Sequence, residues 1–245
     1  MKLKLMYFDG RGLAETSRIL FAIGGEDYED KRYPLEIIDW ATHDMKKEEF
    51  EQDKADGKLL GSLNKLPSLT VDGFIPSSKE EQPEETSVVI PQSKAIERFL
   101  AQRFNLMGEN NVEYALIDSI CECVRDFKDM YQKVRAKPED EKYEAMNEWF
   151  TVTLVERLGL LENLLSDCCC LDKEEALKPG CGYSVGNRLS LADVVLYCFI
   201  TQFFDNKEAS YNATLAAPRL RKIVDSVSKN EKVIEWLKTR PKTLF

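Results

Sequence analysis

Histidine is almost absent from this chain of 245 residues, since His43 is the only one. A metal site built from several histidines is therefore excluded, and any Ser-His-Asp or Cys-His machinery would have to use His43. No stretch approaches the roughly 18 uninterrupted apolar residues of a membrane span. Charged side chains interrupt the N-terminal segment, so it has no secretory pattern. These absences predict an intracellular protein, most simply cytoplasmic, with no membrane partner.

Cysteine patterns typical of disulfides or metal sites are also missing. The seven cysteines include the run Cys168–Cys170, whose neighbouring side chains point apart and do not converge readily on one ion. An odd number without framework spacing predicts free thiols in a reducing compartment, and no metal is expected. Acidic residues outnumber basic ones by 43 to 34, which gives a formal net charge of −9. Nucleic acid is therefore disfavoured as the main partner, because phosphate binding needs a basic surface.

The chain does contain a strand-to-helix junction that carries a tyrosine. Residues 2–7 alternate as a strand and end at Tyr7, a glycine-punctuated turn follows, and residues 14–23 have helical periodicity. Glu15 and Arg18, one helical turn apart, are interpreted as a surface ion pair. The helix start offers free N–H donors and a partial positive charge. Tyr7 is thus either a stabiliser of a thiolate bound there or a tyrosine that packs on the core.

The N-terminal part mixes strands and helices, whereas strand signals vanish after about residue 108. A strand at 28–33 is expected to run parallel to the first in a right-handed βαβ unit. Further strands are predicted at 66–73 and 88–90, with a polar loop at 75–87 between them. Helices are predicted at 45–55, 92–100, 112–135, 139–167, 190–205, 217–228 and 230–239. We expect an α/β domain over residues 1–105 and an all-α domain over 112–245.

Four further features each have two interpretations. Leu66-Pro67 is either a cis bond that presents backbone groups to an extended peptide, or a trans proline opening an edge strand. Gln92-Ser93 is either a carboxylate site at a helix start or a plain N-cap, with Ser93 as the cap. Trp40 is either a buried anchor or a ligand contact. The pattern Ser190-x-x-Asp193 is interpreted as a capping box that starts a core helix.

Taken together, these residues resemble the cytosolic glutathione transferases over almost the whole chain. The specificity lies in their joint order. The tail is similar to sigma-class members and the stretch after Phe8 to mu-class members, so the tyrosine-type branch is favoured. The motifs that carry the resemblance are Tyr7-Phe8-x-x-Arg11-Gly12-x-Ala14-Glu15-x-x-Arg18, Trp40, Lys65-Leu66-Pro67, Gln92-Ser93, Ser190-x-x-Asp193 and Trp236-Leu237-Lys238-Thr239-Arg240-Pro241.

The resemblance implies a thioredoxin-like N-terminal domain, an all-α C-terminal domain and a homodimer. It implies conjugation of glutathione, the co-substrate, to small hydrophobic electrophiles, with peroxidase or isomerase activity as a side reaction. Tyr7 would stabilise the glutathione thiolate, because a thiol with a pKa of about 8.5 is mostly protonated at neutral pH. The other glutathione-binding residues that it implies are Phe8, Leu13, Trp40, Lys65, Leu66, Pro67, Gln92, Ser93 and Asp126.

Each part of glutathione has an implied partner in this family. The Leu66 backbone, beside a cis Pro67, would pair with the cysteinyl part. Gln92 and Ser93 would hold the γ-glutamyl carboxylate, and Trp40 and Lys65 the glycyl end. Asp126 would reach the γ-glutamyl amine bound in the partner subunit.

This chain departs from the family pattern at several positions. Leu13 stands where sigma and alpha members have an arginine, so the thiolate would lack that cationic support. Asp44 stands where a lysine is usual, and Lys46 or Lys47 is the suggested substitute. The loop at 74–90 is longer than in typical members, and the segment from Cys168 to Tyr183 is expanded.

The second-substrate pocket would be lined by Phe8, Leu13 and a helix that carries Lys128, Tyr131 and Lys133. Lys133 stands near the place of a tryptophan found in members that isomerise prostaglandin H. Arg125 replaces a carboxylate of the cluster that binds a divalent ion in certain members. Both departures argue against a specialised prostaglandin synthase activated by metal.

Two other functions are considered beside the enzyme. The chain could be a non-catalytic, transferase-like protein that binds glutathione or has a structural role, as lens crystallins of this type do. A cysteine-type thiol transferase is excluded, because no cysteine precedes Cys121.

Overall fold

The computed structural model describes residues 1–39, 44–75, 86–168 and 182–243. The chain forms two compact units, Met1–Leu100 with Thr239–Phe245, and Ala101–Lys238. The sequence predicts a division between residues 105 and 112, and it does not predict that the last residues belong with the first unit. The predicted loop at 75–87 and the cysteine run fall largely outside the described residues.

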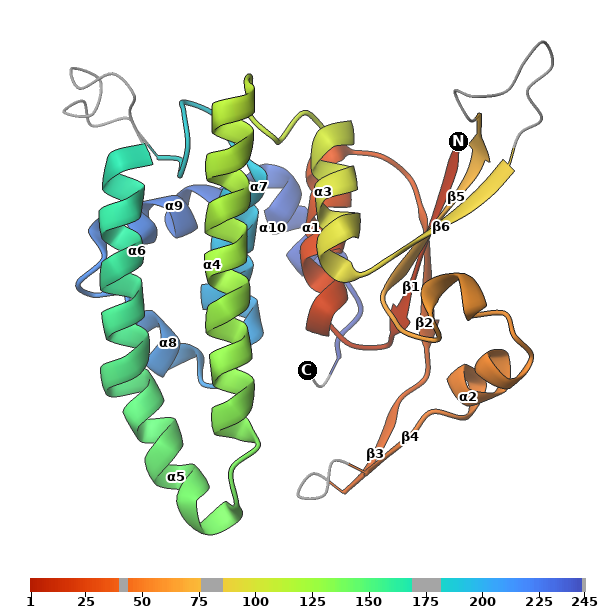
Figure 1. Ribbon diagram of the computed structural model, residues 1–245, viewed down its shortest axis with the longest axis horizontal. Coiled ribbons are helices and arrows are strands. Elements are labelled where there is room, and N and C mark those ends of the chain that lie inside the picture. The colour runs from red at the N-terminus through yellow and green to blue at the C-terminus, as the bar shows by residue number, and fades with distance from the viewer. Residues whose placement is uncertain (40–43, 76–85, 169–181, 244–245) are drawn as a thin grey trace. The chain divides into compact units, whose positions relative to one another are not determined.

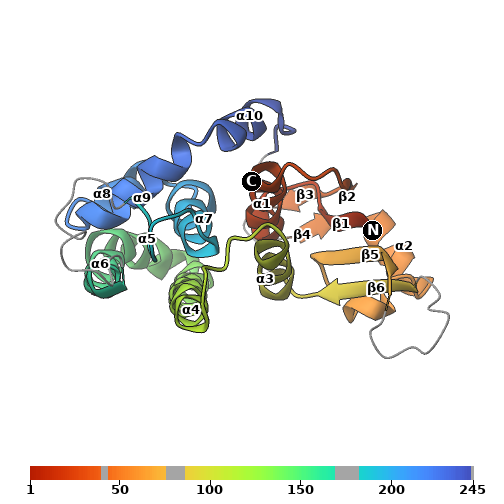
Figure 2. The ribbon, with the colours of Figure 1, turned by 90° about the horizontal axis from the view of Figure 1, so that it is seen from above.

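The first unit is built on a four-stranded mixed sheet with the order β2-β1-β5-β6. Its central strand β1 pairs in parallel with β2 and antiparallel with β5, which pairs antiparallel with β6. Two helices, α1 and α3, cover one face of the sheet, and α2 covers the other (Figures 1 and 2). The elements are β1 (Lys2–Phe8), α1 (Glu15–Gly24), β2 (Glu29–Tyr33), β3 (Glu36–Asp39), β4 (Asp44–Lys46), α2 (Glu48–Ala55), β5 (Ser68–Phe74), β6 (Thr86–Pro91) and α3 (Ser93–Arg103).

Local sequence explains the start of this unit. Leu3 and Leu5 alternate with exposed or half-buried neighbours along β1, so one face of the strand enters the core. Helix α1 ends at Gly24 and is capped by Gly25, whose φ of 65° is the left-handed conformation that glycine adopts freely. The β1-α1-β2 unit and the parallel pairing are confirmed. The small β3–β4 pair was not predicted, because both strands are short and most of β4 falls within the predicted helix at 45–55, which begins only at Glu48.

The second unit is helical in its described part, which confirms an α/β region followed by an all-α region. Helix α7 lies at its centre, and all eight of its residues are buried. Predicted helices at 139–167 and 190–205 each contain a π-helical turn, Trp149–Thr153 and Phe199–Phe203. The α-helices are α4 (Asn111–Arg135), α5 (Glu139–Glu148), α6 (Leu154–Cys168), α7 (Leu191–Cys198), α8 (Lys207–Ala213), α9 (Pro218–Ser228) and α10 (Glu231–Thr239). Helix α8 was not predicted.

The capping box at the start of α7 is confirmed. The Asp193 carboxylate accepts the backbone N–H of Ser190 at 2.7 Å and that of Ser184 at 2.6 Å. Asp193 is fully buried, and burial raises its pKa from 3.8 to about 6, although these donors act in the opposite direction. No described helix has the length and apolar character needed to cross a membrane.

Candidate functional site

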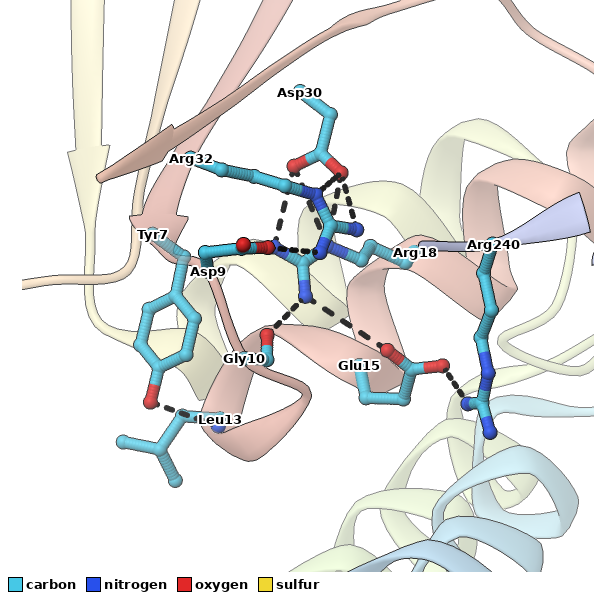
Figure 3. A network of polar contacts seen from close by, with 9 residues as sticks. All are labelled: Tyr7, Asp9, Gly10, Leu13, Glu15, Arg18, Asp30, Arg32 and Arg240. Atoms are coloured by element: carbon cyan, nitrogen blue, oxygen red, sulfur yellow. Dashed lines mark hydrogen bonds and ion pairs between the residues drawn. The ribbon is translucent and has the colours of Figure 1, made fainter. Parts of the chain in front are cut away.

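Tyr7 lies at the carboxyl end of β1, as predicted, and its hydroxyl faces the turn that leads into α1. The backbone N–H of Leu13 donates a hydrogen bond to the Tyr7 hydroxyl oxygen at 3.2 Å (Figure 3). This bond occupies one lone pair and leaves the hydroxyl hydrogen available to another acceptor. The side chain of Leu13 is itself 49% exposed. The phenol is therefore held in place and remains able to donate.

Gly12 makes the close approach of the turn to Tyr7 possible. A Cβ at position 12 would lie 2.5 Å from the Tyr7 hydroxyl oxygen, and the φ of 37° is one that side chains rarely adopt. The short contact and the positive φ both favour glycine at this position. The Arg11-Gly12 pair of the sequence motif thus has a steric reason here.

Burial raises the pKa of Tyr7 above its ordinary value of 10.0. The Leu13 N–H and the charge of Arg18 lower it, but they do not overcome the loss of hydration. Tyr7 consequently stays protonated at neutral pH. A neutral phenol can donate a hydrogen bond to an anion, whereas a phenolate cannot.

Arg18 is a buried element of this site that the sequence analysis misplaced. The predicted surface pair is wrong, because Glu15 is only 3% exposed and Arg18 is 0% exposed. The guanidinium of Arg18 donates to the Gly10 carbonyl at 2.5 Å and pairs with Asp30 at 3.2 Å (Figure 3). It also lies 6.0 Å from the centroid of the Tyr7 ring. Arg18 therefore holds the turn that carries the Leu13 donor.

Helical spacing along α1 gives no signal that Arg18 is buried. All seven residues from Glu15 to Phe21 are buried, so burial here does not follow a single helical face. Asp30, from the parallel neighbour of β1, supplies the opposite charge.

The Leu66–Pro67 bond is cis, so the trans interpretation of this motif is wrong. Leu66 is half-buried and lies two residues before the ladder of β5, which begins at Ser68. The preceding Leu63 and Asn64 both have positive φ, 57° and 56°. Lys65 is exposed, and Pro67 is buried.

Gln92 and Ser93 lie where β6 passes into α3. Gln92 has a φ of 72°, an uncommon value for a non-glycine residue. The Gln92 carbonyl accepts the N–H of Ile96 at 3.0 Å, and α3 begins at Ser93. Ser93 is therefore the first helical residue and not the N-cap, which corrects the predicted position. The backbone N–H groups of a first helical turn have no partners within the helix.

The register of the sheet brings Tyr7, the Leu66–Pro67 bond and Gln92 to the same end of the strands β1, β5 and β6. Met6 is opposite Ser68, and Ser68 is opposite Pro91. Tyr7, the Leu66–Pro67 bond and Gln92 each lie one or two residues beyond these positions. They therefore stand side by side at the same end of three adjacent strands, which are spaced about 4.8 Å apart.

Phe8 points to the opposite face of β1 from Tyr7, as strand alternation requires. Together with Met6 and Leu66 it packs on a buried cluster of Tyr33, Phe50 and Leu59. Its ring lies edge-to-face with Phe50 at a centroid distance of 5.1 Å. Phe8 is thus a half-buried residue that packs against this core cluster.

Several other predicted residues are not joined to this group. Trp40 lies outside the described residues. The suggested lysine substitutes are engaged at the start of α2, Lys46 with Glu48 at 3.1 Å and Lys47 with Glu51 at 3.6 Å.

Asp126 lies in the second unit, on α4. Its carboxylate is 66% exposed and pairs with Arg125 at 3.3 Å.

Tyr131 was expected to line a substrate pocket, and the structure buries it instead. It is 2% exposed and packs against aromatic rings from both π-helical turns and their flanks. Its neighbours are Trp149, Phe150, Phe203 and Phe204, at centroid distances of 5.4, 5.9, 5.6 and 4.9 Å. On the same helix, Lys133 is exposed, and the ammonium of Lys128 lies 4.9 Å above the Phe203 ring.

Within the described ranges, no group of three or more His, Cys, Asp or Glu side chains could hold a metal ion.

Comparison with known proteins gives a consistent set of relatives. Residues 125–240 match the family model of the glutathione S-transferase C-terminal domain. Hematopoietic prostaglandin D synthase of Gallus gallus is 33% identical over 98% of this chain and 97% of its own length. The class-mu 28 kDa glutathione S-transferase of Schistosoma japonicum is 30% identical over 82% of this chain and 81% of its own. A monomeric glutathione S-transferase of the hookworm Necator americanus has a TM-score of 0.75 and 27% identity, with 100% of both chains covered.

Proposed function

The chain belongs to the glutathione S-transferase family, and on that premise we propose that it joins the thiolate of glutathione to small hydrophobic electrophiles. The observation that best supports this proposal is the edge of the sheet where Tyr7, Leu66–Pro67 and Gln92 stand side by side. Three adjacent strands span about 10 Å. An extended tripeptide has about the same length. The size of the edge therefore suits glutathione.

Tyr7 is the proposed catalytic residue. Its hydroxyl oxygen already accepts the Leu13 N–H, so its hydrogen can be donated to the sulfur of glutathione. A hydrogen bond to the anion favours the thiolate over the thiol and lowers the thiol pKa. The thiolate is the nucleophile, so a larger thiolate fraction raises the rate at neutral pH.

The remaining residues are proposed to bind glutathione along this edge. The Leu66 backbone pairs with the cysteinyl part in the manner of an added strand. Gln92 and Ser93 hold the γ-glutamyl carboxylate at the start of α3, where helix N–H donors are open. Trp40 and Lys65 contact the glycyl end.

The exposed side chain of Leu13 is proposed to contact the electrophile. Phe8 and Pro67 support the site from the core side.

A homodimer in the cytoplasm is part of the proposal. Asp126 would act on glutathione bound in the partner subunit, and its exposed carboxylate is consistent with that role. The hookworm relative is described as monomeric, so the oligomeric state of this chain needs its own measurement. Sedimentation at several protein concentrations would give it. The first and second units would be the N- and C-terminal domains of the family.

The substitution Tyr7→Phe tests the proposed chemistry. We expect kcat/KM for a chloronitroarene electrophile to fall by about a hundredfold, the usual effect of losing one donor to a reacting anion. The affinity for glutathione should stay within about twofold. The control is Tyr143→Phe, because Tyr143 is 87% exposed and does not belong to the site or to the charged network around Arg18. That variant should keep its turnover.

Two outcomes would overturn the assignment. Unchanged turnover in Tyr7→Phe would remove Tyr7 from the catalytic role. Retention of the unaltered protein on immobilised glutathione, with no turnover across a panel of electrophiles, would favour the non-catalytic, glutathione-binding alternative.

An isomerase activity is the second candidate, and the similarity to a prostaglandin D synthase favours it. Lys133 and Arg125, the two departures named above, weigh against a metal-activated form. Conversion of prostaglandin H in the presence of glutathione, with and without Mg²⁺, would test it.

A further inference from the structure

The C-terminal segment places a positive charge against a buried carboxylate of the first unit. A guanidinium nitrogen of Arg240 forms a short ion pair with one oxygen of Glu15, which is 3% exposed (Figure 3). The other Glu15 oxygen lies 3.8 Å from Arg18. Glu15 thus stands between a residue at the end of the chain and the arginine that holds the Tyr7 turn.

Three positive and three negative side chains form the contacts drawn for this network between described residues (Figure 3). Arg32 pairs with Asp30 at 2.7 Å and with Asp9 at 3.2 Å, on the far side of Arg18 from Glu15. The hydroxyls of Tyr28 and Tyr7 are further titratable groups that interact with these charges, Tyr28 with Glu15, Arg18, Asp30 and Arg32 and Tyr7 with Arg18. The members of the network are Asp9, Glu15, Arg18, Asp30, Arg32 and Arg240.

We propose that Arg240 is a positioning residue for the Tyr7 site, because its pair with Glu15 keeps that carboxylate from drawing Arg18 away from the Gly10 carbonyl. This inference rests on the proposed function, and it adds to that function a residue more than two hundred positions away in the sequence.

The loss of the Arg240 charge has two possible local results. Arg18 can turn toward Glu15 and loosen the Gly10–Leu13 turn, which weakens the donor to Tyr7. Alternatively, Arg18 stays and the network carries one positive charge less than before. Each result makes an anion at Tyr7 less favourable. Both lead to the same expectation, a glutathione thiol that ionises at higher pH.

The test is the pH profile of kcat/KM for glutathione between about pH 6 and pH 9, since the thiol titrates in this range. Arg240→Gln should move the profile upward by about half a unit to one unit. Activity at the acidic end then falls by about three- to tenfold and converges with the unaltered enzyme at the alkaline end. Arg240→Lys should restore most of the difference.

The matched control is Lys242→Gln, which removes the same charge two residues away from an exposed side chain. It should leave the profile in place. The double variant Glu15→Gln/Arg240→Gln removes both members of the pair and should bring the profile back toward that of the unaltered enzyme. A purely structural role would instead lower kcat equally at all pH values, with no recovery in the double variant.

An unmoved profile in Arg240→Gln, or an equal shift in Lys242→Gln, would overturn this inference and leave Tyr7 in its role. If ultraviolet difference spectra show no thiolate in the glutathione complex of the unaltered protein, the proposed function itself fails.

Discussion

Tyr7 in the first unit and Tyr131 in the second have opposite surroundings, although the sequence suggested a place at the substrate site for both. Tyr7 is half-buried, accepts a backbone N–H at 3.2 Å and lies near a buried arginine. Tyr131 is almost fully buried among aromatic rings, and burial raises its pKa to about 12. We therefore expect Tyr7, whose hydroxyl oxygen has a polar partner, and not Tyr131, whose described neighbours are aromatic rings, to act on a ligand.

The same contrast holds for the charged group that each unit buries. Arg18 is surrounded by carboxylates, with Asp30 at 3.2 Å and Glu15 at 3.8 Å. The carboxylate of Asp193 is instead held by N–H and O–H dipoles from Ser184 and Ser190. The carboxylates compensate the buried charge of Arg18. The dipoles compensate the burial of the Asp193 carboxylate only in part, so the pKa of Asp193 rises.

The largest effect is expected from Tyr131→Ala. It opens a cavity at the centre of the aromatic cluster and should reduce the free energy of unfolding by about 3–5 kcal/mol. Chemical denaturation followed by tryptophan fluorescence would measure this loss, because Trp149 packs on the same ring. The control Tyr143→Ala removes a side chain that is 87% exposed, and it should change stability by less than about 0.5 kcal/mol. A similar small loss in Tyr131→Ala would contradict the structural role.

The second prediction concerns Asp193 and pH. Its folded-state pKa, about 6, lies above the ordinary 3.8, so folding favours the protonated form. Protonated Asp193 contributes to the free energy of unfolding. This contribution is fully present below about pH 4 and is lost as pH rises through about 6.

The unaltered protein should therefore lose about 2–3 kcal/mol relative to Asp193→Asn over this range, since each pH unit between the two values is worth about 1.4 kcal/mol. Urea unfolding at several pH values checks this difference. Asp225→Asn, an exposed residue of α9, is the control. A difference that does not depend on pH would show that Asp193 is ionised throughout.

Gly12→Ala should have the next largest effect and should act on the first unit alone. The new Cβ would fall 2.5 Å from the Tyr7 hydroxyl, so either the phenol or the turn must move. We expect kcat/KM for glutathione to fall by about tenfold, which corresponds to about 1.4 kcal/mol in the activation free energy. Steady-state kinetics at saturating electrophile would measure the change.

Gly25→Ala is the control that separates backbone strain at a positive φ from a steric clash of the new Cβ with Tyr7. Gly25 also has a positive φ, 65°, but nothing lies within 4 Å of a Cβ built there. Both alanine variants should lose about 1 kcal/mol of stability, and only Gly12→Ala should lose activity. Equal activity in the two variants would mean that the contact with Tyr7 does not matter.

Local motifs allowed much of the fold and part of the site to be predicted. The first strand, which extends one residue beyond the predicted end to Phe8, and the capping box at Ser190 each depend on a few neighbouring residues, and both are present. The cis bond before Pro67 was implied by the family resemblance, because the local sequence left the cis and trans forms open. Arg18 was misplaced because spacing along a helix does not distinguish a surface pair from a buried pair. That distinction depends on Asp30, which another strand supplies.

Tyr131 shows a second limit of prediction from sequence. Aromatic residues at helical spacing are typical of a core and equally of the wall of an apolar pocket. The choice depends on the rings that other helices bring to the same point, and here Phe203 and Phe204 come from the end of a different helix. The π-helical turns at both ends of this cluster leave no local signal in the sequence either.

The smallest effect is expected from Tyr131→Phe, and it tests the comparison most directly. The Tyr131 hydroxyl has no hydrogen bond among the described residues, so its removal should change the free energy of unfolding by less than about 0.5 kcal/mol. Turnover should stay within about twofold, whereas the same substitution at Tyr7 is expected to cost about a hundredfold. Chemical denaturation gives the free energy of unfolding, and steady-state kinetics with the chloronitroarene give the turnover. A large loss of activity in Tyr131→Phe would show that this hydroxyl reaches a ligand, and the distinction between the two tyrosines would then fail.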